Sequence, residues 1–313
     1  MLKSEVCALT DLSSPVRRVG VVVVFYHPDD ACIRRANRLS QRYLCVVVDN
    51  TPKCDRRDPA RSTSNAALDP GVVYLSNGAN LGIATAFNRG ISCLREQGCD
   101  IALLFDQDSE PDDMLLTQLP LTLAALRARG ERVAVVGPAY RDSRFGGVTP
   151  FVRFDRFSMQ RVEVAGDTLL DIDFLISSGS CINVEAWTDL GVFDDDLFID
   201  FVDFEWCVRA KHAGYRVIGV PWLQMTHQLG EEPVLVFGRR YPMHSATRHY
   251  YLFRNSIAML KRRYVPLGWK LPELYKIPSR FVVYALFPQD RSAHIGMALR
   301  GLWHGLIGRS GPL

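Results

Sequence analysis

The sequence predicts an α/β protein built around a doubly wound, mostly parallel β-sheet. Two observations support this prediction. Short apolar runs alternate with longer segments of helical periodicity through the first 139 residues, as in parallel sheets whose connections are helices. The runs are also continuously apolar, which is typical of strands buried on both faces. With 313 residues, 48% of them hydrophobic and 23% charged, the chain is long enough to bury a large core.

The first half contains five expected strands and three expected helices. The strands are RVGVVVVFY at 18–26, LCVVVDN at 44–50, GVVYLSN at 71–77, DIALLFDQD at 100–108 and RVAVVGPAY at 132–140. The helices lie between them, at 31–43, 80–98 and 111–130. Asp29 or Asp30 is suited to cap the first helix. Residues 51–70 have no periodicity and predict a loop.

The second half is expected to mix strand directions. Residues 140–170 predict loops and short antiparallel strands, and 171–183 predict a strand that runs into the small-residue turn SSGS. An extended segment is expected at 215–228. Further helices are expected at 184–190 (stopped by Gly191), 196–214 and 245–264.

Charge distribution divides the chain into three parts. We expect an N-terminal tail at 1–16, one domain at 17–260 with halves at 17–139 and 140–260, and basic amphipathic helices at 261–313. The last part carries nine Lys or Arg against two Asp or Glu, although the whole chain has a formal net charge of only +3. So small a net charge does not indicate nucleic-acid binding.

Cysteine spacing and hydropathy indicate the cellular compartment in which the protein is expected. The eight cysteines include no C-x-x-C pair, so zinc-site spacing is absent and buried free thiols in a reducing cytoplasm are expected. The first 15 residues lack the apolar core of a signal peptide, and no uncharged run reaches the length of a membrane-spanning helix. These features predict a cytoplasmic protein.

Polar side chains occur where the predicted parallel strands end. Tyr26, Asp49, Asn77 and Asp106 all fall at such positions. Ligands of open α/β sheets bind outside the carboxyl ends of the strands. The sequence therefore predicts a ligand cleft at this edge. Asp49 is suited to accept from a base imide or a ribose hydroxyl, or else it is a turn residue of DNTP.

The segment IALLFDQDSEP ends an apolar strand on two carboxylates. Asp106 and Asp108 are two residues apart, so they project to the same side of a strand and can hold a hard cation such as Mg²⁺ or Mn²⁺. Alternatively both are solvated and Ser109 or Asp112 begins the next helix. A third interpretation, an aspartyl phosphatase with Asp106 as nucleophile, lacks a suitable Thr or Gly after the pair.

The helix beginning NLGIATAFNRG is a second candidate ligand contact. Asn80 is suited to cap it, and Gly82 would let its first turn approach a phosphate. Plain packing of the helix on the sheet is the alternative interpretation. The segment lacks the GK[ST] of a P-loop and is not a G-x-G-x-x-G motif.

The acidic segment LFIDFVDFEWCVR offers a general base. Asp200 and Asp203 would share one face of a helix, with Glu205 elsewhere. A carboxylate near an acceptor hydroxyl can remove its proton; alternatively, these acids simply favour the positive end of a helix.

Downstream basic and aromatic residues complete the candidates. His227 ends an extended segment and is either structural or a ligand. Arg248, His249, Tyr250, Tyr251 and Arg254 lie on one predicted helix and suit diphosphate oxygens, or they form a solvated face.

The order of these segments resembles the family 2 inverting glycosyltransferases of GT-A fold, and among them the bacterial rhamnosyltransferases. The matching stretches are VVVFYHP, VVVDNTP, NGANLGIATAFNRGI, LLFDQDSEP, ISSGSCIN, FIDFVDFEWCVRA and HYYLFRN, which extend over residues 19–260. DQDS and FIDFVDFEW are the most specific of them. The resemblance implies a Rossmann-like sheet with a mixed acceptor-side half.

The resemblance also implies roles for individual residues. Asp203 falls at the position of the catalytic base, and Asp108 and His227 at those of the metal ligands, with Mg²⁺ or Mn²⁺ as cofactor. The expected nucleotide-sugar contacts are Phe25, Tyr26, Asp49, Asn80, Gly82, Asn88, Asp106, Arg248 and Arg254. Two departures stand out: Val202 replaces the usual Glu before the base, and the first strand ends in Phe-Tyr-His-Pro rather than Thr-Tyr-Asn.

The implied reaction moves L-rhamnose from dTDP-β-L-rhamnose to a hydroxyl of a cell-envelope saccharide, such as lipopolysaccharide core or O-antigen, free or lipid-linked. A Q-x-x-R-W segment, expected of a processive synthase, is absent. The other interpretations are a hydrolase using Asp106 or a non-catalytic nucleotide-sugar-binding protein. Residues 261–313 either contact the inner face of the cytoplasmic membrane or pack on the domain or a partner. The sequence leaves the oligomeric state open.

Overall fold

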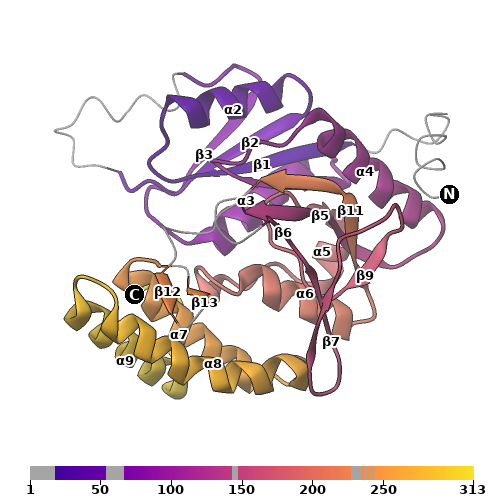
Figure 1. The fold of residues 1–313 in the computed structure, drawn as a ribbon. Coiled ribbons are helices and arrows are strands. Elements are labelled where there is room, and N and C mark those ends of the chain that lie inside the picture. The colour runs from indigo at the N-terminus through magenta and orange to yellow at the C-terminus, as the bar shows by residue number, and fades with distance from the viewer. Residues whose placement is uncertain (1–17, 54–66, 143–146, 227–233, 237–238, 242) are drawn as a thin grey trace.

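The computed structural model describes residues 18–53, 67–142, 147–226, 234–236, 239–241 and 243–313. The predicted tail at 1–16, most of the predicted loop at 51–70, and His227 lie outside these residues. The described chain forms a central nine-stranded sheet with helices on both faces, and further helices gather at one end (Figure 1).

The first half of the sheet is parallel, as predicted. Its strands lie in the order β3-β2-β1-β4, with all neighbours parallel. Their bounds are β1 Val19–Phe25, β2 Leu44–Asp49, β3 Val72–Ser76 and β4 Ile101–Asp106.

The second half of the sheet is mixed, which confirms the predicted change of character. The order continues β10-β5-β11-β9, with β6 beside β5. β10 runs antiparallel to both β4 and β5, and only β5 and β11 are parallel. The strands are β5 Val133–Asp142, β6 Gly147–Thr149, β9 Leu170–Ile172, β10 Cys181–Asn183 and β11 Arg216–Thr226.

Helices cover both faces because alternate strand residues point in opposite directions. Val21 and Val23 of β1 belong to a core with α2 (Asp30–Ser40) and α4 (Asp113–Ala128). Val22 and Val24 belong to the opposite core, formed with α3 (Ile83–Glu96), α5 (Val184–Leu190) and α6 (Val202–His212). This double burial is the physical reason for the continuous apolar runs.

Helix caps decide two of the open interpretations. The Asp29 carboxylate accepts from the N–H of Cys32 at 2.8 Å, so Asp29 rather than Asp30 caps α2. The Asp112 carboxylate accepts from the N–H of Leu115 at 2.7 Å and caps α4. Asp106 and Asp108 therefore precede α4 without capping it.

The single helix predicted at 196–214 is wrong. A short 3₁₀ helix, Asp195–Leu197, is separated from α6 by four residues. Phe198, Asp200 and Phe201 have φ of 65°, 62° and 65°, a left-handed conformation that interrupts a right-handed helix. Asp200 and Asp203 therefore do not share a helical face.

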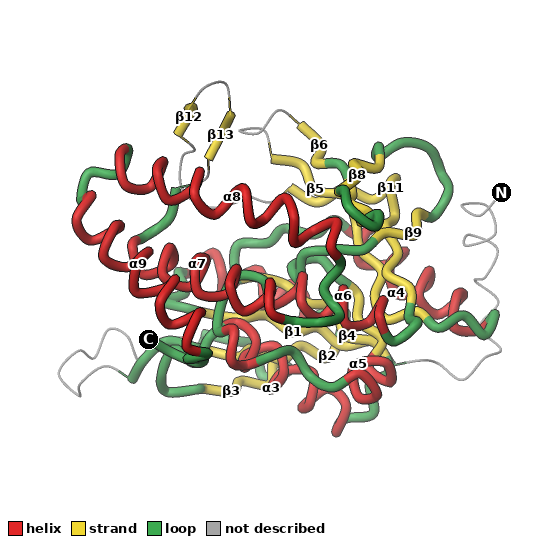
Figure 2. The backbone as a smooth tube through the Cα atoms, turned by 90° about the horizontal axis from the view of Figure 1, so that it is seen from below, coloured by secondary structure: helices red, strands yellow, loops and turns green. Residues whose placement is uncertain are grey.

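Three C-terminal helices pack side by side beyond the sheet (Figure 2). They are α7 Ala246–Lys261, α8 Leu267–Leu286 and α9 Arg291–Ile307. Glycines let α9 lie close to α7: a Cβ on Gly301 would come within 2.4 Å of the Tyr250 carbonyl oxygen. Two hairpins complete the fold, β7 (Phe151–Phe154) with β8 (Met159–Val162) and β12 (Val234–Val236) with β13 (Arg239–Tyr241).

Candidate active site

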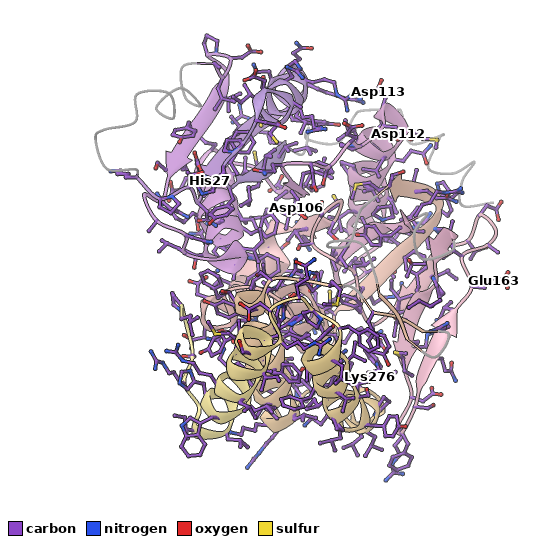
Figure 3. The ribbon with its side chains drawn as sticks, turned by 60° about the vertical axis from the view of Figure 1, so that its left-hand side comes forward. His27, Asp106, Asp112, Asp113, Glu163 and Lys276 are labelled. Atoms are coloured by element: carbon purple, nitrogen blue, oxygen red, sulfur yellow. The ribbon has the colours of Figure 1, made fainter. Side chains whose placement is uncertain are left out.

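The parallel strands end in register at one edge of the sheet. Asp49 pairs with Phe25 across β1 and β2, and Asp106 pairs with Val24 across β1 and β4. The side-chain amide of Gln107 fixes this edge, because it accepts from the N–H of Tyr26 at 2.8 Å and donates to the same residue's carbonyl at 3.1 Å. In Figure 3, Asp106 lies between the sheet and the C-terminal helices.

Phe25 and Tyr26, both predicted to line a nucleotide cleft, differ in accessibility. The Phe25 side chain is fully buried in the core, whereas that of Tyr26 is 46% exposed. Tyr26 can therefore contact a ligand at the strand ends. Phe25 packs in the core next to this edge and is not accessible to a ligand.

Asp106 and Asp108 form an uncompensated carboxylate pair. Asp106 is partly buried and Asp108 is exposed. Burial, and after it the charge of the Asp108 carboxylate, raise the pKa of Asp106 to about 7, although the Arg248 guanidinium opposes the shift. A divalent cation between the two carboxylates would relieve their repulsion.

The turn 176–180 brings Asp203 to the same edge. The Ser177 N–H donates to the Asp203 carboxylate at 3.2 Å, and the hydroxyl of the next residue, Ser178, accepts from the Asp106 N–H at 3.2 Å. The Ser178 hydroxyl also bonds that of Ser109 at 2.6 Å. The segments that carry Asp106 and Asp203 are therefore hydrogen-bonded to consecutive residues of the same turn.

Tyr140 of β5 gives a second indication that Asp106 and Asp203 lie close together. Its hydroxyl donates to the Ser178 carbonyl at 2.8 Å. Burial raises the pKa of Tyr140 well above its usual value, and the charges of Asp203 and Asp106 both add to this shift. Both carboxylates therefore act on the same hydroxyl group.

Asp203 has the properties of a general base. Its carboxylate accepts from the N–H groups of Ser177 and, at 2.8 Å, Phe204. Burial raises its pKa to about 6, although these two hydrogen bonds oppose the shift. Such a carboxylate is ionised at neutral pH and basic enough to take a proton in a transition state.

The two other base candidates are held by cations. Asp200 pairs with Arg248 at 3.0 Å. Glu205 is buried and pairs with Arg209 at 2.8 Å and Arg262 at 3.1 Å. Within the described residues, Asp203 alone of the three has no ion pair, which favours it as the base.

Arg248 of α7 reaches the site from the C-terminal helices. Both its Nε and an Nη donate to the same Asp200 oxygen, at 3.2 and 3.0 Å. Its charge also lowers the pKa of Asp106. The guanidinium is thus a partly exposed cation whose charge acts on Asp106.

Arg254, predicted to contact the diphosphate, has a different role. It is 2% exposed, and its guanidinium donates to the carbonyls of Asp196, Leu197 and Gly311. Asn255 donates to carbonyls of the same loop, including Asp200 at 3.1 Å. These two residues hold the loop that presents Asp200, so Arg254 supports the site without reaching a ligand.

Asn88 is also structural rather than a ligand contact. It is buried, and its amide nitrogen donates to the Phe193 carbonyl and the Asp195 carboxylate, each at 2.8 Å. Its amide oxygen accepts from the Phe193 N–H at 2.9 Å. Asn88 therefore joins α3 to the loop before α6.

The start of α3 also contacts protein. Gly82 is the N-cap, and Asn80 only accepts from the Gly82 N–H at 3.1 Å. Gly82 has φ of 88°, and a Cβ there would lie 2.5 Å from the Phe198 carbonyl oxygen. That oxygen accepts from the Ile83 N–H at 2.8 Å, so the close approach predicted for a ligand is made by the 198–201 loop.

Asp49 is a fixed acceptor at the end of β2. Its two carboxylate oxygens accept from the Thr51 N–H and the Tyr74 hydroxyl, each at 2.7 Å. It is 4% exposed. These bonds agree with the interpretation of Asp49 as a turn residue. A nucleotide would have to bond to a carboxylate oxygen that already accepts a hydrogen bond from the protein.

Sequence reasoning missed Ser177, Ser178, Tyr140 and Gln107. The small-residue turn SSGS could be recognised in the sequence, but the residues to which its serines bond, Asp106 and Asp203, are distant along the chain. For the predicted metal site, no group of three His, Cys, Asp or Glu within the described residues is placed to hold an ion. Two carboxylates nevertheless fit Mg²⁺, which commonly takes its other ligands from substrate phosphates and water.

Comparisons with known proteins identify the family of this chain. Residues 22–174 match the family described as Glycosyl transferase family 2. The dTDP-rhamnosyl transferase RfbF of Shigella flexneri is 30% identical over 263 residues, which cover 82% of this chain and 84% of that protein. The N-acetylglucosaminyl-diphospho-decaprenol L-rhamnosyltransferase of Mycobacterium tuberculosis (strain H37Rv) is 26% identical, covering 87% and 94%.

Among solved structures, the crystal structure of GalNAc-T7 with UDP, GalNAc and Mn²⁺ is similar, with a TM-score of 0.52 and 14% identity. The match covers 90% of this chain but 58% of that one, so this chain spans less than two thirds of its length. This likeness supports the fold alone.

Proposed function

The chain belongs to glycosyl transferase family 2 and has the GT-A fold, and on this premise we propose that it transfers L-rhamnose from dTDP-β-L-rhamnose to a hydroxyl of a cell-envelope saccharide. As a family member it is a glycosyltransferase. The observation that most supports the site proposed here is the shared turn, in which Ser177 bonds Asp203 and Ser178 bonds Asp106.

In this proposal Asp203 is the general base. Its carboxylate takes the proton of the acceptor hydroxyl, the hydroxyl oxygen bonds to C1 of rhamnose, and the bond from C1 to the diphosphate breaks. The displacement occurs in one step from the face opposite the diphosphate, so a β-L-rhamnosyl donor gives an α-L-rhamnoside. The hydrogen bonds from Ser177 and Phe204 orient the carboxylate.

Asp108, with Asp106 beside it, would hold Mg²⁺ or Mn²⁺. When bound, such an ion neutralises charge that develops on the departing diphosphate. Arg248 supplies a further positive charge at this edge, and its pairing with Asp200 keeps the guanidinium in place. Tyr26 and Asp49 are the proposed nucleotide contacts.

The donor assignment draws on the relatives. Both the Shigella and the mycobacterial protein are named as rhamnosyltransferases, and the first names dTDP as the carrier. No side chain in this structure identifies the 6-deoxy carbon of rhamnose. The donor is therefore proposed from sequence similarity, and the catalytic roles from geometry.

The acceptor is proposed to be a lipid-linked saccharide of the cell envelope. The mycobacterial relative is named for a sugar on a diphospho-decaprenol. By analogy, we propose that this chain acts at the inner face of the cytoplasmic membrane.

A product assay tests the proposal. The protein is incubated with dTDP-β-L-rhamnose, Mg²⁺ or Mn²⁺ and a panel of acceptors that includes an N-acetylglucosaminyl-diphospho-lipid, and the product is analysed by NMR. We expect an α-L-rhamnoside, and weaker or no product with UDP- or GDP-linked sugars. Release of phosphate from simple esters without glycoside formation would instead indicate the phosphatase interpretation, and transfer of a different sugar would refute the donor assignment.

A further inference from the structure

Exposed apolar side chains concentrate on the last two helices. Of the 18 large hydrophobic residues exposed in the described chain, 12 lie between residues 267 and 313. Exposed apolar residues scattered singly are normal for a soluble protein, whereas a concentration of this kind marks an interaction surface.

The exposed residues form one stripe on each helix. On α8 they are Leu267, Leu271, Leu274, Tyr275, Val282 and Leu286; on α9 they are Leu299, Trp303, Leu306 and Ile307. Their spacings of three, four and seven residues place each set on one helical face. The opposite face of α8 is buried through Val283 and Tyr284, which pack on α7 and α9. We call these ten residues the α8–α9 surface.

Exposed arginines lie close in sequence to the residues of this surface. Arg263, Arg291, Arg300 and Arg309 are exposed, and each lies within four residues of an exposed apolar residue of this segment. None of the four forms an ion pair with any residue that the structure describes. The segment therefore combines exposed apolar area with a net positive charge.

We propose that the α8–α9 surface docks on the face of a lipid bilayer that contains anionic headgroups. Basic residues around an apolar helical face, with Trp and Tyr among the apolar residues, are the features of helices that lie in the membrane interface. None of the helices in the described part of the chain has the length and hydropathy of a membrane span.

A second copy of the chain is a poorer occupant of this surface. A two-fold interface brings the same patch of both copies together, so the arginines of one copy would approach those of the other. Anionic lipid supplies the opposite charge over the whole surface. The charge pattern therefore favours a bilayer over a dimer.

The docking surface is connected to the catalytic edge through α7. Arg248 lies on α7, and its neighbour His249 stacks on Tyr284 of α8 with ring centroids 3.7 Å apart. His249 is also bonded to His294 of α9 at 2.8 Å. A bilayer in contact with α8 and α9 would thus lie next to α7, the helix that carries Arg248. This arrangement suits the lipid-linked acceptor of the proposed function.

Quenching of tryptophan fluorescence by brominated lipid tests the proposal without any sugar substrate. Of the five tryptophans, Trp303 is 61% exposed, while Trp187, Trp206 and Trp269 are buried and Trp222 is partly buried. The full chain is mixed with phosphatidylcholine vesicles, with and without phosphatidylglycerol, whose acyl chains carry bromine. We expect quenching only with phosphatidylglycerol and at low salt, and its loss in Trp303→Phe although that variant still floats with the vesicles.

Substitutions on the surface complete the test. Leu274→Glu and Trp303→Glu, both at exposed positions, should reduce flotation with anionic vesicles by about tenfold or more. Phe157→Glu, at an equally exposed apolar position in the β7–β8 hairpin, should not. Vesicle binding that survives both surface substitutions, or no binding by the unmodified chain, would overturn the proposal. So would a dimer in sedimentation velocity that Leu274→Glu dissociates. A chain that binds vesicles but transfers no sugar would refute the proposed function alone.

Discussion

Asp106 and Asp203, distant in sequence, are hydrogen-bonded to consecutive residues of one turn, Ser178 and Ser177. The first ends a parallel strand and the second begins α6. Because the turn holds the backbone of Asp106 and the carboxylate of Asp203, the proposed nucleotide contact and the proposed base belong to one site. The predictions below follow from this arrangement.

Removal of one carboxylate of the Asp106 and Asp108 pair should weaken metal-dependent donor binding. We expect Asp108→Asn to weaken binding of dTDP-β-L-rhamnose in the presence of Mn²⁺ by about tenfold to a hundredfold, as measured by calorimetry, because the cation loses a charged ligand. Asp100→Asn, at the exposed opposite end of β4, is the matched control and should bind normally. Metal-dependent binding by Asp108→Asn that is as tight as that of the unmodified chain would contradict the assignment.

The rate of transfer should depend on pH through Asp203. Its pKa of about 6 is raised above the ordinary value for Asp, so the carboxyl is protonated and inactive as a base below that pH and ionised above it. We expect kcat/KM at saturating metal to rise about tenfold per pH unit up to about pH 6 and then to level off. A profile that falls over this range would exclude Asp203 as the base.

Arg248 and Arg254 should respond in opposite ways to the same substitution. Arg248→Gln should raise KM for the donor about tenfold or more and leave the melting temperature nearly unchanged, because its guanidinium is partly exposed beside the carboxylates. Arg254→Gln should instead lower the free energy of unfolding by about 3 kcal/mol, because it removes the hydrogen bonds that the buried guanidinium donates to the carbonyls of Asp196 and Leu197. Kinetics and thermal unfolding of both variants distinguish the two roles. A large rise in donor KM for Arg254→Gln without loss of stability would instead support the prediction, made from the sequence, that Arg254 contacts the donor.

Gly82→Ala should destabilise the protein rather than weaken ligand binding directly. Both the φ of 88° and the 2.5 Å approach to the Phe198 carbonyl oppose a Cβ at this position, and we expect a loss of about 2 kcal/mol in denaturant unfolding. Gly71→Ala, whose Cβ would meet no atom within 4 Å, is the control and should change stability little. If Gly82→Ala were as stable as Gly71→Ala, the packing of α3 on the 198–201 loop would be in doubt.

Much of the fold could be predicted because its signals are local. The apolar runs predicted strands β1 to β5, and the caps and glycine stops placed most helices within a few residues. The antiparallel insertion of β10 between β4 and β5 could not be foreseen, because three residues, Cys181–Asn183, carry no information about their neighbours. The loop at 198–201 was predicted as helix because its left-handed residues, Phe198, Asp200 and Phe201, are not glycines.

The motifs predicted candidate site residues without showing which of them have partners within the protein. A polar side chain in a motif does not reveal whether its partner is a ligand or a distant carbonyl. Asn88 and Arg254 bond the loop before α6, whereas Asp203 has no cationic partner in the described part of the chain. Conversely, the sequence does not indicate that Ser177 and Ser178 bond to Asp203 and Asp106, because these partners are distant along the chain.

The most direct test of the central claim is a single-turnover assay of Asp203→Asn with dTDP-β-L-rhamnose, metal and the acceptor on which the unmodified chain acts. We predict that donor affinity is retained within about threefold while the rate of α-L-rhamnoside formation falls by about a thousandfold or more, because the amide cannot take the acceptor's proton. Transfer by Asp203→Asn at nearly the unmodified rate would contradict the account.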